Sequence, residues 1–524
     1  MKQHRTPTGC AAEQGSTSFN RGSRLATAGT TTTLAIAIVA LACLVAQGAD
    51  ARPGGGQGYS GGGGHSSGGG SGGGDGAGII IELLIRLIIY YPQVGIPLAL
   101  IVIAIFVVRA RHGNTLRSER WSSSGEPSIE APAPRGSVDI NALRARDPEF
   151  SLVLFEDFLY ALYARIHTAR SDPAAMASLA PYVAPASRQA LLAREPTGQT
   201  ISGVVIGAMR IASVKLGDDA TRVELEFESN YTAAGPRGPQ GYYVHERWTV
   251  ERAAGVLTRP REAGDAWTFR CPNCGAAFES TGDERCRFCK QEVGEGRFDW
   301  SVSHVRLLRQ ETRPPALTAE VAEQGTNRRT IFDPKVQAQH AALISDDPGA
   351  APELIERRLR AIYSELNLAW TALDLKRIRP LVSDSLYNYL EYWISAYRNQ
   401  GLRNVLEQMA VERVQIVKLT RDLHYDAITL RFWAAGLDYT VRAADNHRVS
   451  GSNTRKRKYS EYWTLIRGAK VRGAPRDPGT CPSCGAPSDK VSMAGTCEYC
   501  GAHLTRGEFD WVLSKIEQDE SYRG

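Results

Sequence analysis

Two stretches of the chain show the same order of hydrophobic patterns, a helical pattern followed by several strand patterns. In both stretches, apolar residues first recur at steps of three and four, which predicts an amphipathic helix. These positions are Leu152, Phe155, Leu159, Leu162 and Ile166, and then Ile355, Leu359, Ile362, Leu366 and Ala369. Each helix has an apolar face that another element must cover. A second helix is expected near 173–193 and near 379–400.

After the helices, the pattern changes to alternating segments rich in β-branched and aromatic residues, which predicts strands. These segments are 204–216, 221–231, 242–251 and 298–307 in the first stretch, and 411–419, 425–439, 459–466 and 509–516 in the second. We therefore expect an α+β protein with two tandem units, residues 147–310 and 353–517. Each unit would pack its helices on one face of a curved, mainly antiparallel sheet.

Short motifs at matching places support this internal repeat. Glu246-Arg247-Trp248-Thr249 corresponds to Glu461-Tyr462-Trp463-Thr464, and Phe298-Asp299-Trp300 corresponds to Phe509-Asp510-Trp511. Because the motifs keep their order and spacing, the two units are expected to be homologous. A polar linker, residues 311–352, separates them.

Eight of the ten cysteines form two sets of paired Cys-x-x-Cys motifs, one in each unit. The sets are Cys271, Cys274, Cys286 and Cys289, and Cys481, Cys484, Cys497 and Cys500. Four thiolates at this spacing complete a tetrahedral zinc shell, which predicts two zinc ribbons, 271–289 and 481–500, with two structural ions. A closed shell leaves no position for a catalytic water. The alternative is disulfide pairing, which would suit an oxidising compartment.

Prolines and glycines beside the cysteines fit this interpretation. Pro272 and Pro482 would stiffen the Cys-x-x-Cys turns. Gly275, Gly485 and Gly501 directly follow a cysteine, where they allow a positive φ angle.

The N-terminal residues 1–51 are expected to be a signal peptide or an N-terminal signal anchor. The apolar run 34–46 has the length of a signal sequence, and Ala49-Asp50-Ala51 offers a cleavage site. Cys43 leaves open a third interpretation, a lipid-modified cysteine. Residues 52–78 are mostly glycine and predict a flexible tether.

Residues 79–108 are strongly apolar and long enough to cross a bilayer once, which predicts a transmembrane segment. Its charges, Glu82 and Arg86, can pair across one helical turn or face a partner helix. The linker 109–146 that follows begins with several arginines. By the positive-inside rule, the two α+β units would be cytoplasmic. Cytoplasmic thiols stay reduced, which favours zinc over disulfides.

Composition leaves room for two ordinary domains after the membrane segment. The chain has 524 residues, 43% of them hydrophobic and 23% charged, and a net charge of +6. This mild charge does not require a nucleic-acid partner, and we regard nucleic acid as disfavoured. The only tight basic run comprises Arg455, Lys456, Arg457 and Lys458. It is either a solvated turn or a contact for anionic lipid headgroups.

The expected tether and the rest of the chain differ in the usual catalytic motifs. Gly-x-Ser-x-Gly occurs only inside the glycine-rich stretch 52–78, without the strand-to-helix turn that a nucleophile elbow needs, and the chain contains no phosphate-binding loop and no His-Glu-x-x-His motif. Glu224, Glu226 and Glu228 share one face of an expected strand, and His245 lies on the next strand. They could form an acid–base site or a hydrated sheet face. No catalytic residue is assigned.

With this layout, the chain resembles bacterial membrane proteins that carry a Tim44-like domain, over most of residues 34–517. The resemblance rests on the signal, the glycine-rich stretch, the apolar segment with Tyr91-Pro92-x-x-Gly95-x-Pro97, and units that contain Trp248 and Trp463. It implies a cone-shaped fold similar to nuclear transport factor two, with a deep apolar pocket. In the mitochondrial relative this domain attaches to the membrane and scaffolds an import motor. Two copies, a metal loop in each and a membrane span depart from that pattern, so the motor function is not carried over.

The sequence therefore predicts a membrane-anchored, zinc-containing binding or scaffold protein. It would cross the bacterial inner (plasma) membrane once after signal cleavage, and it is more consistent with a non-enzyme. Its expected partners are membrane lipids and a protein or peptide docked at the cytoplasmic face, in protein transport or complex assembly. Homo-oligomerisation stays open. The alternatives are a hydrolase or isomerase that uses a cone-fold pocket, and a nucleic-acid-binding zinc-ribbon protein.

Overall fold

The computed structural model describes residues 140–524, except 237, 260–267, 281–283, 313–316, 318–325 and 520. The described residues belong to one compact unit of the chain. The expected signal segment, glycine tether and transmembrane segment lie outside the described residues. No helix in the described part is both long and apolar enough to cross a bilayer.

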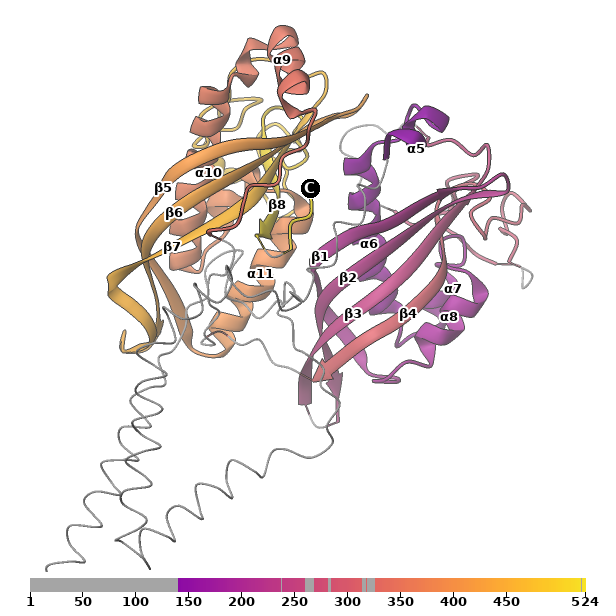
Figure 1. Ribbon diagram of the computed structural model, residues 1–524. Coiled ribbons are helices and arrows are strands. Elements are labelled where there is room, and N and C mark those ends of the chain that lie inside the picture. Colours follow the sequence, from indigo (N-terminus) through magenta and orange to yellow (C-terminus); the bar gives the residue numbers. More distant parts are fainter. Residues whose placement is uncertain are drawn as a thin grey trace, which may run out of the picture. The chain divides into compact units, whose positions relative to one another are not determined.

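The first α+β unit consists of short helices and one long helix on a four-stranded antiparallel sheet with strand order β1-β2-β3-β4. Its helices are α5 (Ile140–Arg146), α6 (Leu152–Ala169), α7 (Pro173–Ala177) and α8 (Pro185–Leu192). Its strands are β1 (Thr200–Leu216), β2 (Ala220–Gly235), β3 (Gly238–Ala253) and β4 (Ser301–Thr312). The helices cover one face of the sheet (Figure 1).

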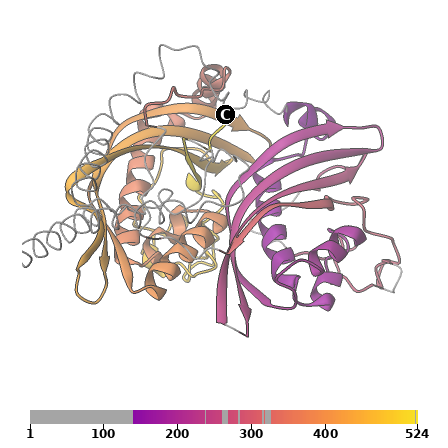
Figure 2. The same cartoon turned by 60° about the horizontal axis from the view of Figure 1, so that its bottom comes forward.

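The second unit repeats this order with longer elements and the sheet β5-β6-β7-β8, again antiparallel. Its helices are α9 (Val336–Asp346), α10 (Pro352–Ala372) and α11 (Asp384–Asn399), with short 3-10 turns at Pro348–Ala350, Lys376–Leu381 and Ser488–Lys490. Its strands are β5 (Leu402–Arg421), β6 (Tyr425–Arg442), β7 (Arg448–Gly468) and β8 (Val512–Gln518). Here too the two long helices, α10 and α11, lie on one face of the sheet (Figure 2). The order of helices before antiparallel strands is confirmed in both units.

The predicted apolar stripes form the two main cores. In α6 the side chains of Leu162 and Ile166 are fully buried, and so are Ile362 and Trp370 of α10. Serine caps set the start of α6 and α11: the hydroxyl of Ser151 accepts a hydrogen bond from the N–H of Leu154 at 3.4 Å, and that of Ser383 accepts one from the N–H of Leu386 at 3.3 Å. The same pattern of steps that predicts the helices therefore also selects the residues that fill the cores.

Several details differ from the sequence prediction. The single helix expected over 173–193 is two helices, because the chain is extended around Val183, which pairs with Val302, and Pro185 starts α8. Strands β5 and β7 start well before the expected 411 and 459. In β5 the first part was not predicted because a bulge near Gln408 (φ 51°) interrupts the alternation of the strand. The Phe-Asp-Trp motifs precede β4 and β8 instead of lying within them.

Candidate metal centres and buried polar site

Both cysteine sets lie in loops between the third and fourth strands of their sheets, 271–289 between β3 and β4 and 481–500 between β7 and β8. All eight cysteines are free. Within each set the four sulfur atoms approach one another to within 4.8 Å. The tertiary structure therefore brings together all the cysteines that the sequence grouped.

Each Cys-x-x-Cys turn has the same backbone hydrogen bonds. The N–H of Gly275 donates to the carbonyl of Cys271 at 2.9 Å, and the N–H of Cys271 donates to the carbonyl of Ala276 at 2.9 Å. The other three turns repeat both bonds from Cys286, Cys481 and Cys497. The residue after the second cysteine always has positive φ: Gly275 74°, Lys290 61°, Gly485 77° and Gly501 70°. The expected role of the three glycines is confirmed.

The sulfur geometry fits a single tetrahedral ion in each set. The Sγ–Sγ distances are 3.8 Å for Cys271–Cys289 and 3.9 Å for Cys274–Cys286. In the second set they are 3.9 Å for Cys481–Cys500 and 3.8 Å for Cys484–Cys497. Metal–sulfur bonds of about 2.3 Å in a tetrahedron place neighbouring sulfurs about 3.8 Å apart, whereas a disulfide needs about 2.05 Å. Four thiolates of this geometry suit zinc or iron.

Polar groups favour the thiolate form that a metal requires at one sulfur of each set, Cys289 and Cys500, whereas burial raises the pKa of Cys271. The Asn273 side chain and the N–H of Gln291 lower the pKa of Cys289. In the second set, the N–H of Ala502 lowers the pKa of Cys500. N–H donors of this kind compensate part of the charge of a four-thiolate site.

A buried Asp–Arg–Trp clamp fixes the base of each ribbon. In the first unit, the Arg252 guanidinium donates to Asp147 at 2.7 Å and lies 4.6 Å from the ring centre of Trp300. In the second unit, Arg467 donates to Asp347 at 2.7 Å and lies 4.3 Å from the ring of Trp511. The clamp joins the start of the unit, the third strand and the residue before the fourth strand, so the Phe-Asp-Trp repeat has a structural role.

A glycine at the end of each ribbon allows close backbone contact with the third strand. A Cβ atom on Gly296 (φ 74°) would lie 2.6 Å from the carbonyl oxygen of Glu251. A Cβ on Gly507 (φ 77°) would lie 2.8 Å from the Cα of Arg467. Larger residues would displace the ribbon from the sheet at both places.

Ion pairs and hydrogen bonds hold the three candidate glutamates. Glu226 pairs with Arg247 at 2.5 Å, and Glu228 pairs with Arg210 at 2.7 Å. Glu224 accepts from the Ser213 hydroxyl at 3.0 Å. Although partial burial opposes the shift, Arg247 lowers the pKa of Glu226, which favours its charged form.

His245 is the strand partner of Glu228, but no bond joins their side chains among the hydrogen bonds of the described residues. The three glutamates of β2 and their partners Arg210, Ser213 and Arg247 thus form a polar ladder across β1, β2 and β3. That arrangement agrees with the interpretation as a sheet face.

A second polar cluster, which the sequence did not predict, lies inside the first unit. Glu246 of β3 is completely buried. One of its oxygens accepts hydrogen bonds from the Tyr163 hydroxyl at 2.6 Å and from His167 Nε2 at 3.0 Å. Arg194 forms an ion pair with the other oxygen. We call these four side chains the Glu246 cluster.

His167 is neutral in this cluster. Burial, and then the nearby Arg170, lower the pKa of His167 well below its usual range. Arg170 also donates to His167 Nδ1 at 3.4 Å, which requires that nitrogen to be unprotonated. In the second unit Asn367 stands at the corresponding helix position, so the second unit has no titrating group there.

The neutral histidine makes the first unit sensitive to mild acid. Because the pKa of His167 is lower in the folded than in the unfolded chain, protons bind the unfolded chain preferentially below about pH 6.5. We expect His167 to have little effect on the pH dependence of the wild-type free energy of unfolding above pH 6.5. Between pH 6.5 and 5.5 this free energy should fall by roughly 1 kcal/mol. His167→Asn, which copies the second unit, should remove this loss. Urea unfolding of both proteins across this range is the measurement, and parallel pH profiles would refute the assignment.

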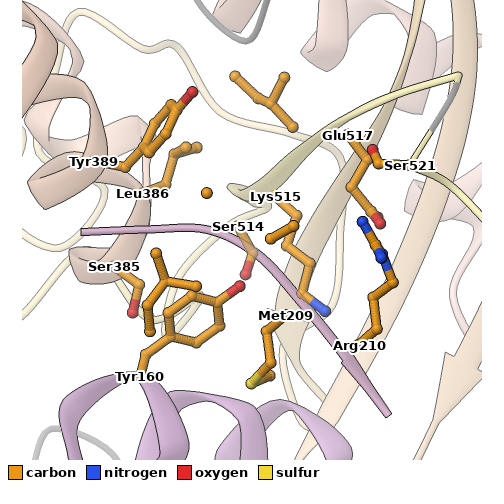
Figure 3. Close-up of a pocket in the computed structure, with 14 residues that line it drawn as sticks. Tyr160, Met209, Arg210, Ser385, Leu386, Tyr389, Ser514, Lys515, Glu517 and Ser521 are labelled. Carbon is orange, nitrogen blue, oxygen red and sulfur yellow. The ribbon is translucent and has the colours of Figure 1, made fainter. Parts of the chain in front are cut away.

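A small pocket of about 50 Å³ lies beside α6, β1, α11 and β8 (Figure 3). This volume suits a few water molecules. Its charged residues include Lys515, which pairs with Glu156 at 2.5 Å, and Glu517, whose pKa burial raises. Neither Glu226 nor His245 lines it. The pocket therefore does not contain the acid–base pair considered from the sequence.

The basic run lies on β7. Arg455, Lys456 and Lys458 are exposed, whereas Arg457 is partly buried and lies 3.8 Å from Asp438. The strand position differs from the expected turn. Three of the four cations are nevertheless available to an anionic surface.

Comparison with known proteins identifies part of the chain. Residues 337–478 match the family model of the Tim44-like domain. The chain carries a Tim44-like domain. The match covers α9 to β7 and ends just before the second cysteine set.

The other comparisons add little to the Tim44-like assignment. Among solved structures, an "Ntf2 like protein involved in plasmid conjugation" is similar, with 7% identity over 70% of this chain and 94% of that chain, and a TM-score of 0.17. A TM-score this low carries no argument. A search of curated proteins found no match. The first unit lies outside the Tim44-like match but has the same order of helices, strands and cysteine loop.

The sequence patterns did not point to several residues that are important in both units. Asp147 and Asp347 precede the first long helix of each unit, and Arg252 and Arg467 follow the Glu-x-Trp-Thr motifs. An alignment of the Tim44-like domain with the first unit would have revealed them. Arg194 offered no such signal, because its pairing with Glu246 depends on a loop that folds over the helix.

Proposed function

We propose that this protein is a membrane-anchored scaffold whose two zinc-stapled α+β units bind a partner protein or peptide at the cytoplasmic face of a bacterial inner membrane. The observation that carries the proposal is the closed four-sulfur set in each unit. A metal with four protein ligands has no open position for substrate, so its role is to hold the ribbon. Two linked modules raise the effective concentration for a shared partner.

Zinc is the metal we propose for both sites. The eight thiolates fit zinc and iron equally well by geometry. Zinc is redox-inactive, which suits a purely structural role. Cytoplasmic placement, which keeps these thiols reduced, is supported by the arginines after the apolar segment 79–108.

Anionic lipid is the proposed secondary contact. Arg455, Lys456 and Lys458 of β7 are exposed and would be attracted to a negatively charged leaflet. The Tim44-like match supports a role near a membrane only by analogy.

Purification of the tagged full chain from membranes in mild detergent tests the binding function. We expect a specific protein to co-purify with the wild-type chain and to be lost from the Cys286→Ser/Cys497→Ser chain, which keeps the membrane segment. Protease treatment of inverted and right-side-out vesicles should cleave both units only in inverted ones. Recovery of the same proteins with both chains, or cleavage from the outside, would refute the proposal.

A further inference from the structure

Each ribbon leaves one aromatic side chain in solvent at the same place, directly before its last cysteine. Phe288 is 57% exposed and Tyr499 is 68% exposed. A single exposed aromatic residue needs no explanation. Its recurrence in both ribbons does, because nothing in the metal site requires an aromatic residue there.

The ribbons do not need these rings for their own cores. The first ribbon buries Phe278 (7% exposed) and Val293 (1%) beside its cysteines. The second buries Val491 and Leu504 in the same way. Phe288 and Tyr499 belong to neither cluster. Contact of these apolar rings with water is therefore unfavourable in free energy, and burial against a partner protein would remove this contact.

The charges around the two rings differ, although the rings are retained. Beside Phe288 are Arg287 and Lys290, both exposed; the corresponding neighbours of Tyr499 are Glu498 and Gly501. A phosphate-rich partner, whether nucleic acid or anionic lipid, would require cations at both tips. An apolar recess on a protein requires only the ring, since aromatic side chains act as anchors in protein interfaces.

We propose that Phe288 and Tyr499 are the anchors by which the two ribbons dock on a partner protein, each ring entering an apolar recess. This inference rests on the proposed binding function and specifies its surface. In this proposal, each metal ion keeps its Cys-x-x-Cys turn rigid, so that the aromatic ring is held in a fixed position.

Site-specific photo-crosslinking in cells that naturally make the protein tests this surface. The full chain carries p-benzoylphenylalanine at position 288 or 499, or at the matched control positions Leu368 (51% exposed) and Leu423 (58%). We expect one and the same protein to be captured from 288 and 499, and not from the controls. Capture of nucleic acid, lipid or a second copy of this chain at the tips would overturn the proposal, as would equal capture at the controls.

Affinity measurements with that purified protein complete the test. Phe288→Ala and Tyr499→Ala in the full chain should each raise Kd by about tenfold or more, while Phe288→Tyr and Tyr499→Phe should bind like wild type. Metal content should be unchanged in all four variants. Unchanged Kd in the alanine variants, or loss of metal from them, would overturn the proposal. If a partner still co-purifies with these variants, the anchor assignment fails and the scaffold function stands; if no partner co-purifies with wild type, both fail.

Discussion

Cys286→Ser should halve the metal content of the full-length protein, from two ions per chain to one. Cys286 is completely buried beside its three partner sulfurs, and a serine oxygen is a poor substitute for a thiolate at a soft tetrahedral site. Structural zinc stabilises isolated zinc-finger peptides by about 10–16 kcal/mol, so the first ribbon should lose its folded state. Cys497→Ser should have the same effect on the second ribbon alone. Elemental analysis by mass spectrometry gives the ion count, and hydrogen exchange shows which ribbon loses protection.

The chain offers a matched control for these variants. Cys10 and Cys43 lie outside both sets, so Cys10→Ser and Cys43→Ser should retain two ions. Iron in place of zinc would contradict the proposed metal while leaving the site intact. Two retained ions in Cys286→Ser, or cystines in the purified wild-type chain, would contradict the metal centre itself.

Glu246→Gln should be the most destabilising single substitution that keeps the shape of the first core. The change leaves the Arg194 cation, whose side chain is 9% exposed, without its fully buried counterion. Removal of one partner from a buried ion pair typically costs about 3–5 kcal/mol. Amide hydrogens of β2 and β3 that exchange only by unfolding of this unit should then exchange at least a hundred times faster, because each 1.4 kcal/mol is about tenfold.

Two further variants separate the charge effect from a packing effect. Glu226→Gln removes a half-buried ion-pair partner from the neighbouring strand and should cost only about 0–1 kcal/mol. Arg194→Met added to Glu246→Gln should restore part of the loss, because no unpaired charge then remains in the core. Equal exchange rates in Glu246→Gln and Glu226→Gln would show that the Glu246 cluster does not stabilise the unit.

Much of this protein is encoded locally and could be predicted from the sequence. Steps of three and four between Leu152 and Ile166 predict α6, because a helix places those residues on one face. Cysteine spacing predicts both metal sites, because all four ligands lie within about twenty residues and need only a short loop to meet. Matching motifs predict the duplication without any reference to a fold.

The tertiary structure alone decided which distant side chains meet. Asp147 reaches Arg252, and Glu246 reaches Tyr163 and Arg194, across many residues and different elements. Such pairs depend on how a helix packs on a sheet and where a loop folds back, and neither is expressed in a local periodicity. The bulge that extends β5 escaped prediction for the same reason, since it breaks the alternation that identifies a strand. The spacing of residues along the chain thus determined the helices, the strands and the metal ligands. Tertiary packing determined the buried charge pairs that stabilise the interior of each unit.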